Sequence, residues 1–317
     1  MLVDLFLSLA LLCVGFYIII RGGDLLVRSA LNLSQLSGIS TVVVGATFVS
    51  LATTLPEIII SVYAILTRNQ AIAVGNAIGG MIVSFAVIFA LYAVIHPKSV
   101  SKQQLVLKSL FLFASLFLVI LFSLDGRITL FGGFILGLVY FLYLAITTKK
   151  SQKTPVLKKS IEGVQMKTVL REFLFGQMLL LFGAFLLVHN SERLALDLGI
   201  SETIVGFTLV AMGTSMPELV TVLSSVKRNS SDLAIGSIIG SNIINATLLL
   251  GICGVVGALH GSPLVISPTT LFIAIPVLII ASLISILPIL IKGRTYRLQG
   301  ISLLVLYGIY LLALFLI

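Results

Sequence analysis

Charged residues are scarce in this chain: Asp, Glu, Lys and Arg together make up 10% of its 317 residues, against about 25% in ordinary soluble domains. Hydrophobic side chains make up 59%, and the mean hydropathy is +1.21. At about 20 apolar residues per membrane crossing, ten crossings use roughly 200 residues, which leaves no room for a sizeable soluble domain. Continuous apolar runs such as 110–121 and 271–291 exclude an outer-membrane barrel, whose strands alternate in polarity. The composition therefore predicts an all-α polytopic membrane protein.

Cysteines are also few, and no secretory leader is evident. Cys13 and Cys253 both lie in apolar runs without CxxC spacing, so we expect buried packing residues rather than a disulfide or metal site. The N-terminal run lacks a basic segment and a small-residue cleavage site, so residues 3–20 are predicted to belong to the first permanent helix. The net charge of +9 does not indicate nucleic acid, because the basic residues are scattered between hydrophobic runs.

Apolar runs separated by polar breaks predict ten transmembrane helices, centred near residues 15, 52, 83, 113, 137, 180, 213, 246, 278 and 306. An even number puts both termini on one side. Most of the 20 lysines and arginines fall in alternate connections, whereas the other connections hold only Arg68, Arg127 and Arg193. Because basic loops stay in the cytoplasm, we expect a multi-pass protein of the cell membrane with both termini extracellular.

The chain divides into two similar halves. A basic linker, 149–168, separates residues 1–148 from residues 169–317, with five predicted helices in each half. Thr53-Thr54-Leu55-Pro56-Glu57 aligns with Thr214-Ser215-Met216-Pro217-Glu218, and the same offset of 161 residues aligns several other segments without a gap. Two copies with an odd number of helices must be inverted relative to one another in the membrane. The sequence thus predicts two inverted five-helix repeats.

Two glutamates stand deep within apolar spans, Glu57 and Glu218, at corresponding places in the two repeats. A charge at the centre of a spanning helix costs roughly 3 kcal/mol or more to insert. Two such charges at related positions predict a function at the membrane midplane rather than a polar contact that only holds helices together. Asp24, in contrast, is expected to form a local ion pair with Arg21 or Arg28.

A proline precedes each glutamate, and hydroxyl residues precede each proline. Proline has no N–H to donate, and its ring clashes with the carbonyl four residues earlier, so helix 2 is predicted to break near Ala52 and helix 7 near Gly213. Freed carbonyls are tolerated in a membrane only where protein, water or an ion pairs with them. Since carboxylate, hydroxyl and carbonyl oxygens are the ligands of hard cations, this pattern predicts a cation site.

Glycine-rich segments begin the following helices: Gly75-Asn76-Ala77-Ile78-Gly79-Gly80 and Gly236-Ser237-Ile238-Ile239-Gly240-Ser241-Asn242. Neither is a P-loop or a GxGxxG turn. Glycines four residues apart allow helices to approach closely, which would bring the next turn against the broken helices. We therefore expect Ser84 and Asn245 to add oxygens to the same centre. The histidines are expected at helix ends or in loops rather than as ligands: His96, His189 and His260.

The paired motifs Gly-x-Thr…Thr-Ser/Thr-x-Pro-Glu, each followed by Gly-x-x-x-Gly, resemble the α-repeats of the cation/calcium exchanger superfamily, in particular its prokaryotic sodium/calcium exchangers. The resemblance covers nearly the whole chain. It implies a ten-helix exchanger in which the long first and sixth helices move past a fixed core. It also implies a set of ion ligands: Thr54, Glu57, Ser215, Glu218, Ser241 and Asn245, with backbone oxygens at Ser50, Thr53, Ala211 and Thr214.

The chain departs from that pattern at three positions. The family usually has Ser and then Asn or Asp where this chain has Gly80 and Ser84, and it frequently has Asp where this chain has Asn245. Gly80 offers no side-chain oxygen. The coupling ion and the stoichiometry therefore stay open.

Charge arithmetic indicates how exchange would work. Two ionised glutamates supply −2, which one Ca²⁺, two or more Na⁺ or two protons would neutralise, and ions that share ligands compete. We therefore expect an antiporter that exchanges Ca²⁺ for Na⁺ at one site with alternating access. It would be a transporter rather than an enzyme, with the bilayer and the ions as its partners and no cofactor, nucleic acid or obligatory protein partner.

Three alternatives remain at this stage. The nearest is a Ca²⁺/H⁺ or other cation/H⁺ exchanger, in which protonation of the two glutamates supplies the counter-charge. An intramembrane enzyme could use the same glutamates as acid and base, although no nucleophile–histidine pair accompanies them. A passive cation channel is the third alternative, and saturable, counter-ion-dependent flux would exclude it.

Overall fold

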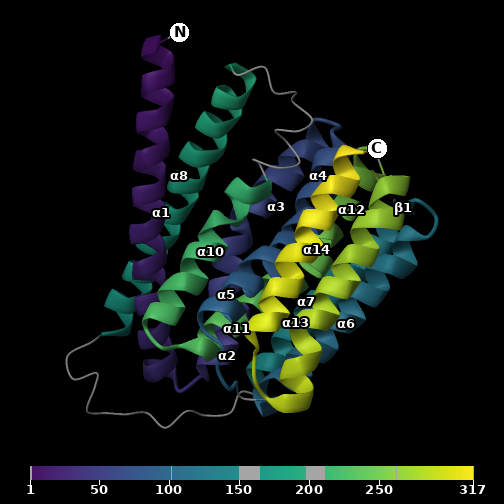
Figure 1. The fold of residues 1–317 in the computed structure, drawn as a ribbon. Helices are drawn as coiled ribbons and strands as arrows, with labels where there is room; N and C mark the ends of the chain where they lie inside the picture. Colours follow the sequence, from purple (N-terminus) through teal and green to yellow (C-terminus); the bar gives the residue numbers. More distant parts are fainter. Residues whose placement is uncertain (1, 101, 150–164, 198–210, 262, 317) are drawn as a thin grey trace.

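The computed structural model describes residues 2–100, 102–149, 165–197, 211–261 and 263–316, and these residues are helical nearly throughout (Figure 1). In chain order the elements are α1 (Leu2–Ser37), α2 (Thr41–Val44), a π-helical segment (Gly45–Val49), α3 (Ser50–Leu66), α4 (Gln70–Val83), a π segment (Ser84–Phe89), α5 (Ala90–Ile95), α6 (Lys102–Ser123), β1 (Arg127–Ile128), α7 (Leu130–Lys149), α8 (Met166–Asp197), α10 (Ala211–Lys227), α11 (Ser231–Ile244), a π segment (Asn245–Leu249), α12 (Leu250–Leu259), β2 (Leu264–Val265), a π segment (Thr270–Ala274), α13 (Ile275–Lys292) and α14 (Arg297–Phe315).

Most of these helices can cross a membrane. Among the described residues, nine helices are long and apolar enough to span a bilayer, counting Thr41–Leu66, Gln70–Ile95 and Ser231–Leu259 as continuous rods. The predicted span centred near residue 213 is described only from Ala211 onward, as α10. Large apolar side chains such as Phe131 and Phe134 of α7 are exposed on the outside, as expected where the surrounding medium is lipid. The prediction of an all-α polytopic membrane protein is confirmed.

The long helices α1 and α8 pack along one another at one side of the molecule (Figure 1). A Cβ on Gly15 would lie 3.2 Å from the carbonyl oxygen of Gly183, and a Cβ on Gly22 would lie 3.0 Å from that of Gly176. Gly176 is the repeat counterpart of Gly15, and Gly183 is that of Gly22. Gly15 therefore faces the counterpart of Gly22, and Gly22 faces the counterpart of Gly15. A two-fold relation between inverted repeats produces this crossed pairing, and it allows the two backbones to approach closely.

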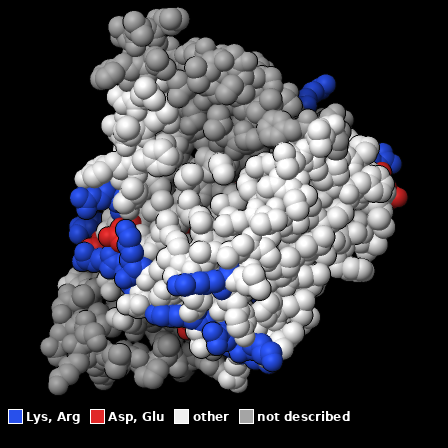
Figure 2. Space-filling model, viewed as in Figure 1, with Lys and Arg blue, Asp and Glu red and all other residues white. Residues whose placement is uncertain are grey.

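The two chain ends lie toward the same end of the bundle, as an even number of crossings requires (Figure 1). On the face seen in Figure 2, the exposed lysines and arginines gather mainly toward the opposite end.

A short antiparallel pairing of β1 with β2 connects the two repeats, and in it Ile128 lies opposite Leu264. The linker residues 150–164 are outside the described part of the chain.

The buried apolar residues that the structure describes form two hydrophobic clusters. The larger lies mainly among α4 to α7 and α11 to α14, and the smaller lies mainly between α1, α8 and the start of the α2–α3 span. Cys253 is buried in the larger cluster, as predicted, whereas Cys13 is exposed on α1. The prediction that Cys13 is buried was wrong because α1 stands at the edge of the bundle, where an apolar residue can face the lipid instead of the core.

Candidate cation site

Two carboxylates lie in the interior where four helices meet. Glu57 on α3 is 2% exposed and Glu218 on α10 is 3% exposed. Helices α3 and α10 pack against one another, and α4 and α11 pack against both. The helices that carry the two glutamates and the two glycine-rich segments therefore surround a common centre, as the sequence predicts.

The helix that carries Glu57 is not interrupted at Ala52, where we predicted a break, and the break predicted near Gly213 falls at the edge of the described residues, since α10 is described only from Ala211. Helix α3 is continuous through Ala52 and Pro56, and α10 is continuous through Gly213 and Pro217. The departure from α geometry comes earlier in the first repeat, at the π-helical segment Gly45–Val49. π segments are frequent at functional sites, and two more begin at the repeat-related candidate ligands Ser84 and Asn245.

Hydroxyl groups bond to backbone oxygens at the start of α3. The Thr54 hydroxyl donates to the Ser50 carbonyl oxygen (2.7 Å), and the Thr53 hydroxyl lies 3.2 Å from the carbonyl oxygens of both Val49 and Ser50. The Ser50 hydroxyl in turn donates to the Thr47 carbonyl oxygen. Side-chain donors thus bond to carbonyl oxygens in and directly after the irregular segment Gly45–Val49.

Glu218 accepts hydrogen bonds from both repeats. The Ser241 hydroxyl donates to its Oε1 at 2.6 Å, and the Ser84 hydroxyl donates to the same oxygen at 2.7 Å. The Asn242 side-chain amide donates to the Ser84 Oγ at 2.7 Å. Ser84 and Ser241 therefore reach the site as predicted, whereas the contribution of Asn242 was not foreseen. The only signal for it in the sequence was an amide inside an apolar span, directly after Ser241.

Several buried oxygens of the site have no hydrogen-bond partner within the residues that the structure describes. They are Glu57 Oε2, Ser215 Oγ, Asn242 Oδ1 and Asn245 Oδ1. Buried polar atoms in folded proteins are nearly always paired, and a carboxylate, a hydroxyl and amide oxygens are ligands that hard cations accept. The described residues contain no group of three His, Cys, Asp or Glu suited to a metal. These ligands fit a cation that is coordinated mainly by oxygen atoms, of which only the two carboxylates carry a formal charge.

The glycines near the site differ in what surrounds them. A Cβ on Gly240 would lie 2.5 Å from the Ala46 carbonyl oxygen and one on Gly236 would lie 2.5 Å from the Val42 carbonyl oxygen, so both positions need glycine for close packing. A Cβ on Gly79 would meet no atom within 4 Å, so no close approach is seen there among the residues that the structure describes. A Cβ on Gly80 would meet only the Asn245 amide nitrogen at 3.5 Å, an ordinary contact.

The remaining candidate ligands lie in the same region. Ala211 begins α10, where only its backbone is described, and Thr214 lies one turn further on, where its hydroxyl donates to Asn76 Oδ1 at 3.2 Å. The histidines have other positions. His96 and His260 lie at the ends of α5 and α12, and the His189 ring stacks on that of Phe185 within α8.

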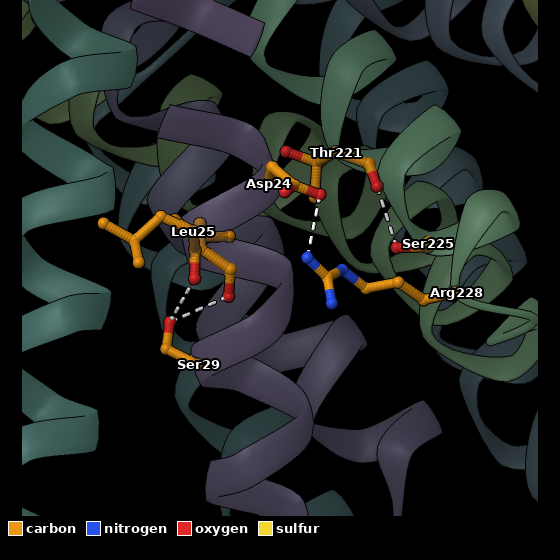
Figure 3. Close-up of polar contacts among 7 residues, drawn as sticks. Asp24, Leu25, Ser29, Thr221, Ser225 and Arg228 are labelled. Atoms are coloured by element: carbon orange, nitrogen blue, oxygen red, sulfur yellow. Dashed lines mark hydrogen bonds and ion pairs between the residues drawn. The ribbon is translucent and has the colours of Figure 1, made fainter. Parts of the chain in front are cut away.

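Asp24 pairs with the other repeat rather than with a neighbour in its own helix. Its Oδ1 lies 3.0 Å from Nη2 of Arg228, just after α10, as Figure 3 shows. The predicted local pair with Arg21 or Arg28 was wrong, because Asp24 faces α10, and the Arg21 Nε donates to the Tyr17 hydroxyl instead. The helices are tightly packed here, since a Cβ on Gly23 would lie 2.6 Å from a methyl group of Val220.

A cavity of about 620 Å³ lies between α3, α8 and α10. Its lining includes Pro56, Tyr63 and Thr67 on one side, Phe185 and His189 on another, and Thr214 at its inner end. It therefore extends from the residues beside Glu57 toward the end of the bundle where α8 finishes (Figure 1). Thr67 and Phe185 are the repeat counterparts of Arg228 and Asp24. The junction of α3 with α8 therefore contains a cavity, whereas the related junction of α10 with α1 contains the Asp24–Arg228 ion pair.

Inverted repeats, two buried carboxylates at related positions and a cavity that leads toward one of them are features expected of a membrane transporter for cations. The family model for the sodium/calcium exchanger protein matches residues 7–149 and 171–316. The chain belongs to this family, whose members are ion exchangers and not enzymes.

Individual relatives agree with that assignment. The chain is 26% identical to the sodium/calcium exchanger MaX1 of Methanosarcina acetivorans, over 96% of this chain and 97% of the relative. It is 32% identical to the inner membrane protein YrbG of Escherichia coli, over 78% of this chain and 79% of that protein. A solved structure of the sodium-calcium exchanger NCX_Mj, soaked with Na⁺ and Ca²⁺, superposes with a TM-score of 0.82 at 29% identity and covers 97% of this chain and 98% of its own.

Proposed function

We propose that this exchanger moves Ca²⁺ in one direction and Na⁺ in the other, at one shared site between Glu57 and Glu218. The observation that carries the proposal is a set of neutral oxygens at the site: the Ser84 hydroxyl donates to Glu218, and the buried oxygens of Ser215 and Asn245 have no partner among the described residues. A proton would need only the carboxylates themselves, whereas Na⁺ and Ca²⁺ both need several oxygen ligands. The names of the relative MaX1 and of the solved exchanger support Na⁺ as the coupling ion.

In this proposal Glu57 and Glu218 bridge Ca²⁺, with help from the side chains of Thr54, Ser215, Ser241, Asn245 and Ser84 and from the carbonyl oxygens of Ser50, Thr53, Ala211 and Thr214. The carboxylate charge of −2 is neutralised by one Ca²⁺ or by at least two Na⁺. Because the ions use the same ligands, release of one is required before the other binds, and this competition couples their movement.

Alternating access is supported by the difference between the two repeat-related junctions. A cavity lies between α3 and α8, whereas α1 and α10 are closed against one another by tight packing and by the Asp24–Arg228 pair. We propose that α1 and α8 move past the other helices to exchange these two arrangements. Each of the proposed halves, 1–148 and 169–317, which the linker 149–168 joins, contributes one of the two moving helices.

Flux measurements in reconstituted vesicles test the coupling ion. Ca²⁺ uptake should follow an outward Na⁺ gradient and should be insensitive to a pH gradient imposed without Na⁺. Vesicles containing the Glu57→Gln protein are the control for leak. Uptake that follows the pH gradient and ignores Na⁺ would support the cation/H⁺ alternative and contradict the proposal.

We further propose that both termini are extracellular in the cell membrane. The gathering of lysines and arginines at the end opposite the termini supports this orientation (Figure 2). In a background with Cys13 and Cys253 replaced, a membrane-impermeant maleimide added to intact cells should label Ile317→Cys and leave Ser151→Cys in the linker unlabelled. The reverse pattern would contradict the proposed orientation.

A further inference from the structure

Asn76 on α4 joins three helices through one side chain. Its Nδ2 donates to the Glu57 carbonyl oxygen at 3.0 Å and to the Ser61 Oγ at 2.9 Å, both on α3. Its Oδ1 accepts the hydrogen bond from the Thr214 hydroxyl on α10. The side chain is 4% exposed, so both amide donors and the acceptor are used inside the membrane-spanning bundle. Asn76 therefore bonds to the backbone and a side chain of the Glu57 helix and to a side chain of the Glu218 helix, and none of these described bonds involves a carboxylate.

The partners of Asn76 lie on the faces that carry the glutamates. Glu57 and Ser61 are four residues apart on α3, and Thr214 and Glu218 are four residues apart on α10, so each pair lies on one helix face. Fixing the Glu57 carbonyl fixes the point from which its carboxylate extends. Fixing Thr214 fixes the first turn of α10, which is one turn before Glu218. The Asn76 amide therefore sets the spacing between the two helix faces that carry the carboxylates.

The repeat-related position does not provide this connection. Ser237 is the counterpart of Asn76, and its buried Oγ has no hydrogen-bond partner within the part of the chain that the structure describes. Thr53 is the counterpart of Thr214, and its hydroxyl donates to carbonyl oxygens of its own helix. A buried amide therefore connects the Glu57 backbone to α10, whereas the related position in the second repeat has only a serine.

We infer that Asn76 is a positioning residue for ion binding, which raises the affinity for Ca²⁺ by holding the Glu57 and Thr214 segments at the separation that Ca²⁺ requires. The inference rests on the proposed function of the site. A divalent ion bridged between two helices depends on their spacing, because each ligand must lie within a narrow range of distances from it. Maximal turnover does not depend on the amide in the same way, since Asn76 is not itself a ligand.

The test compares Asn76→Ala and Asn76→Ser with Ser237→Ala in purified, reconstituted protein. Asn76→Ser places at position 76 the residue that the second repeat has, and Ser237→Ala removes a hydroxyl that makes no hydrogen bond with the described residues. We expect the half-saturating Ca²⁺ concentration to rise about tenfold in the Asn76 variants, the typical effect of losing a buried hydrogen-bonded contact. The maximal rate per folded protein should stay within twofold of the wild type, and Ser237→Ala should change neither quantity by more than twofold.

A double-mutant cycle isolates the contact with α10. Thr214→Val removes the hydroxyl and keeps the backbone oxygen. If the two residues act through their hydrogen bond, the half-saturating concentration of the Asn76→Ala, Thr214→Val double variant should not exceed that of the more affected single variant. Ca²⁺-induced shifts in melting temperature, measured on the same proteins, report binding without transport.

Three results would overturn the inference: half-saturation within twofold of the wild type in both Asn76 variants, a loss of maximal rate with unchanged half-saturation, or an equal rise in Ser237→Ala. Absence of Ca²⁺ flux and of Ca²⁺-induced stabilisation in the wild-type protein is a different result, which would overturn the proposed function itself.

Discussion

At the scale of single residues, Glu57 and Glu218 occupy related positions and yet have different surroundings. Glu218 Oε1 receives hydrogen bonds from Ser84 and Ser241, whereas Glu57 Oε2 has no partner among the described residues. The difference follows from the sequence, because Ser241 corresponds to Gly80 in the first repeat and Ser84 corresponds to Asn245. The hydroxyls of two serines therefore point to one carboxylate.

Replacing either glutamate by glutamine should abolish exchange. Glu57→Gln and Glu218→Gln each remove one of the two charges available to neutralise Ca²⁺, and loss of one partner of a buried charge interaction costs about 3–5 kcal/mol, which corresponds to a rate reduced more than roughly hundredfold at a given Ca²⁺ concentration. Ca²⁺ flux in vesicles measures the loss, and size-exclusion elution verifies folding. Exchange retained by either variant would contradict the shared site.

Gly80→Ser should fold normally and change ion binding. The position has room for a side chain, since among the described residues a Cβ there would meet only the Asn245 amide, at 3.5 Å, and serine would supply the oxygen found at the related Ser241. We expect an unchanged melting temperature and a half-saturating Ca²⁺ concentration that differs from the wild type by more than threefold.

Gly240→Ser is the matched control for that substitution. Its Cβ would lie 2.5 Å from a backbone oxygen of Ala46, so we expect a strongly lowered melting temperature. Equal melting temperatures for the two variants would show that the packing at Gly240 is less strict than these distances indicate.

At the scale of the elements, the sequence predicts the ten spans and the location of the site but not the local helix geometry. The prolines lie in the two helices that carry the glutamates, yet α3 is continuous at Ala52, where we predicted a break, and departs from α geometry at Gly45–Val49 instead. The π segments that begin at Ser84 and Asn245 have no signature in a hydrophobic pattern, since one extra residue in a turn leaves the composition unchanged. The partner of Asp24 was not predicted either, because Arg228 lies in the other repeat, far from Asp24 in the sequence.

The Asp24–Arg228 pair should couple α1 to α10 in a measurable way. Both side chains are partly exposed, at 50% and 32%, and exposed pairs contribute about 0.2–1 kcal/mol. We expect Asp24→Arg and Arg228→Asp each to lower the melting temperature by a few degrees at low salt, and the exchanged double variant to recover most of the loss. Additive losses in the double variant would indicate that the two charges act independently.

At the scale of the whole molecule, bound ions should stabilise the fold competitively. A ligand that binds only the folded state adds about 2.7 kcal/mol of stability at a hundred times its dissociation constant. Ca²⁺ should therefore raise the melting temperature by several degrees, and Na⁺ should reduce that shift as its concentration increases. Shifts by Ca²⁺ and Na⁺ that add together would indicate separate sites and contradict the exchange mechanism. The Glu218→Gln protein should show no Ca²⁺ shift.

The internal duplication could be recognised from the sequence because the offset of 161 residues is ungapped over long stretches. The arrangement of the repeats follows from the odd helix number, and the crossed glycine contacts between α1 and α8 agree with it. What a periodic pattern could not supply is the set of contacts that only one repeat makes, because each depends on side chains that meet across the interface.

Those unmatched contacts bear on the energy of the transport cycle. If the two inverted repeats were identical, the inward-facing and outward-facing forms would be rotated copies of one another and would have equal free energies in a symmetric bilayer. Asn76 with Thr214, and Asp24 with Arg228, have no repeat-related equivalents among the described contacts. Any difference in free energy between the inward-facing and outward-facing forms must therefore come from such positions, where the two repeats differ in sequence.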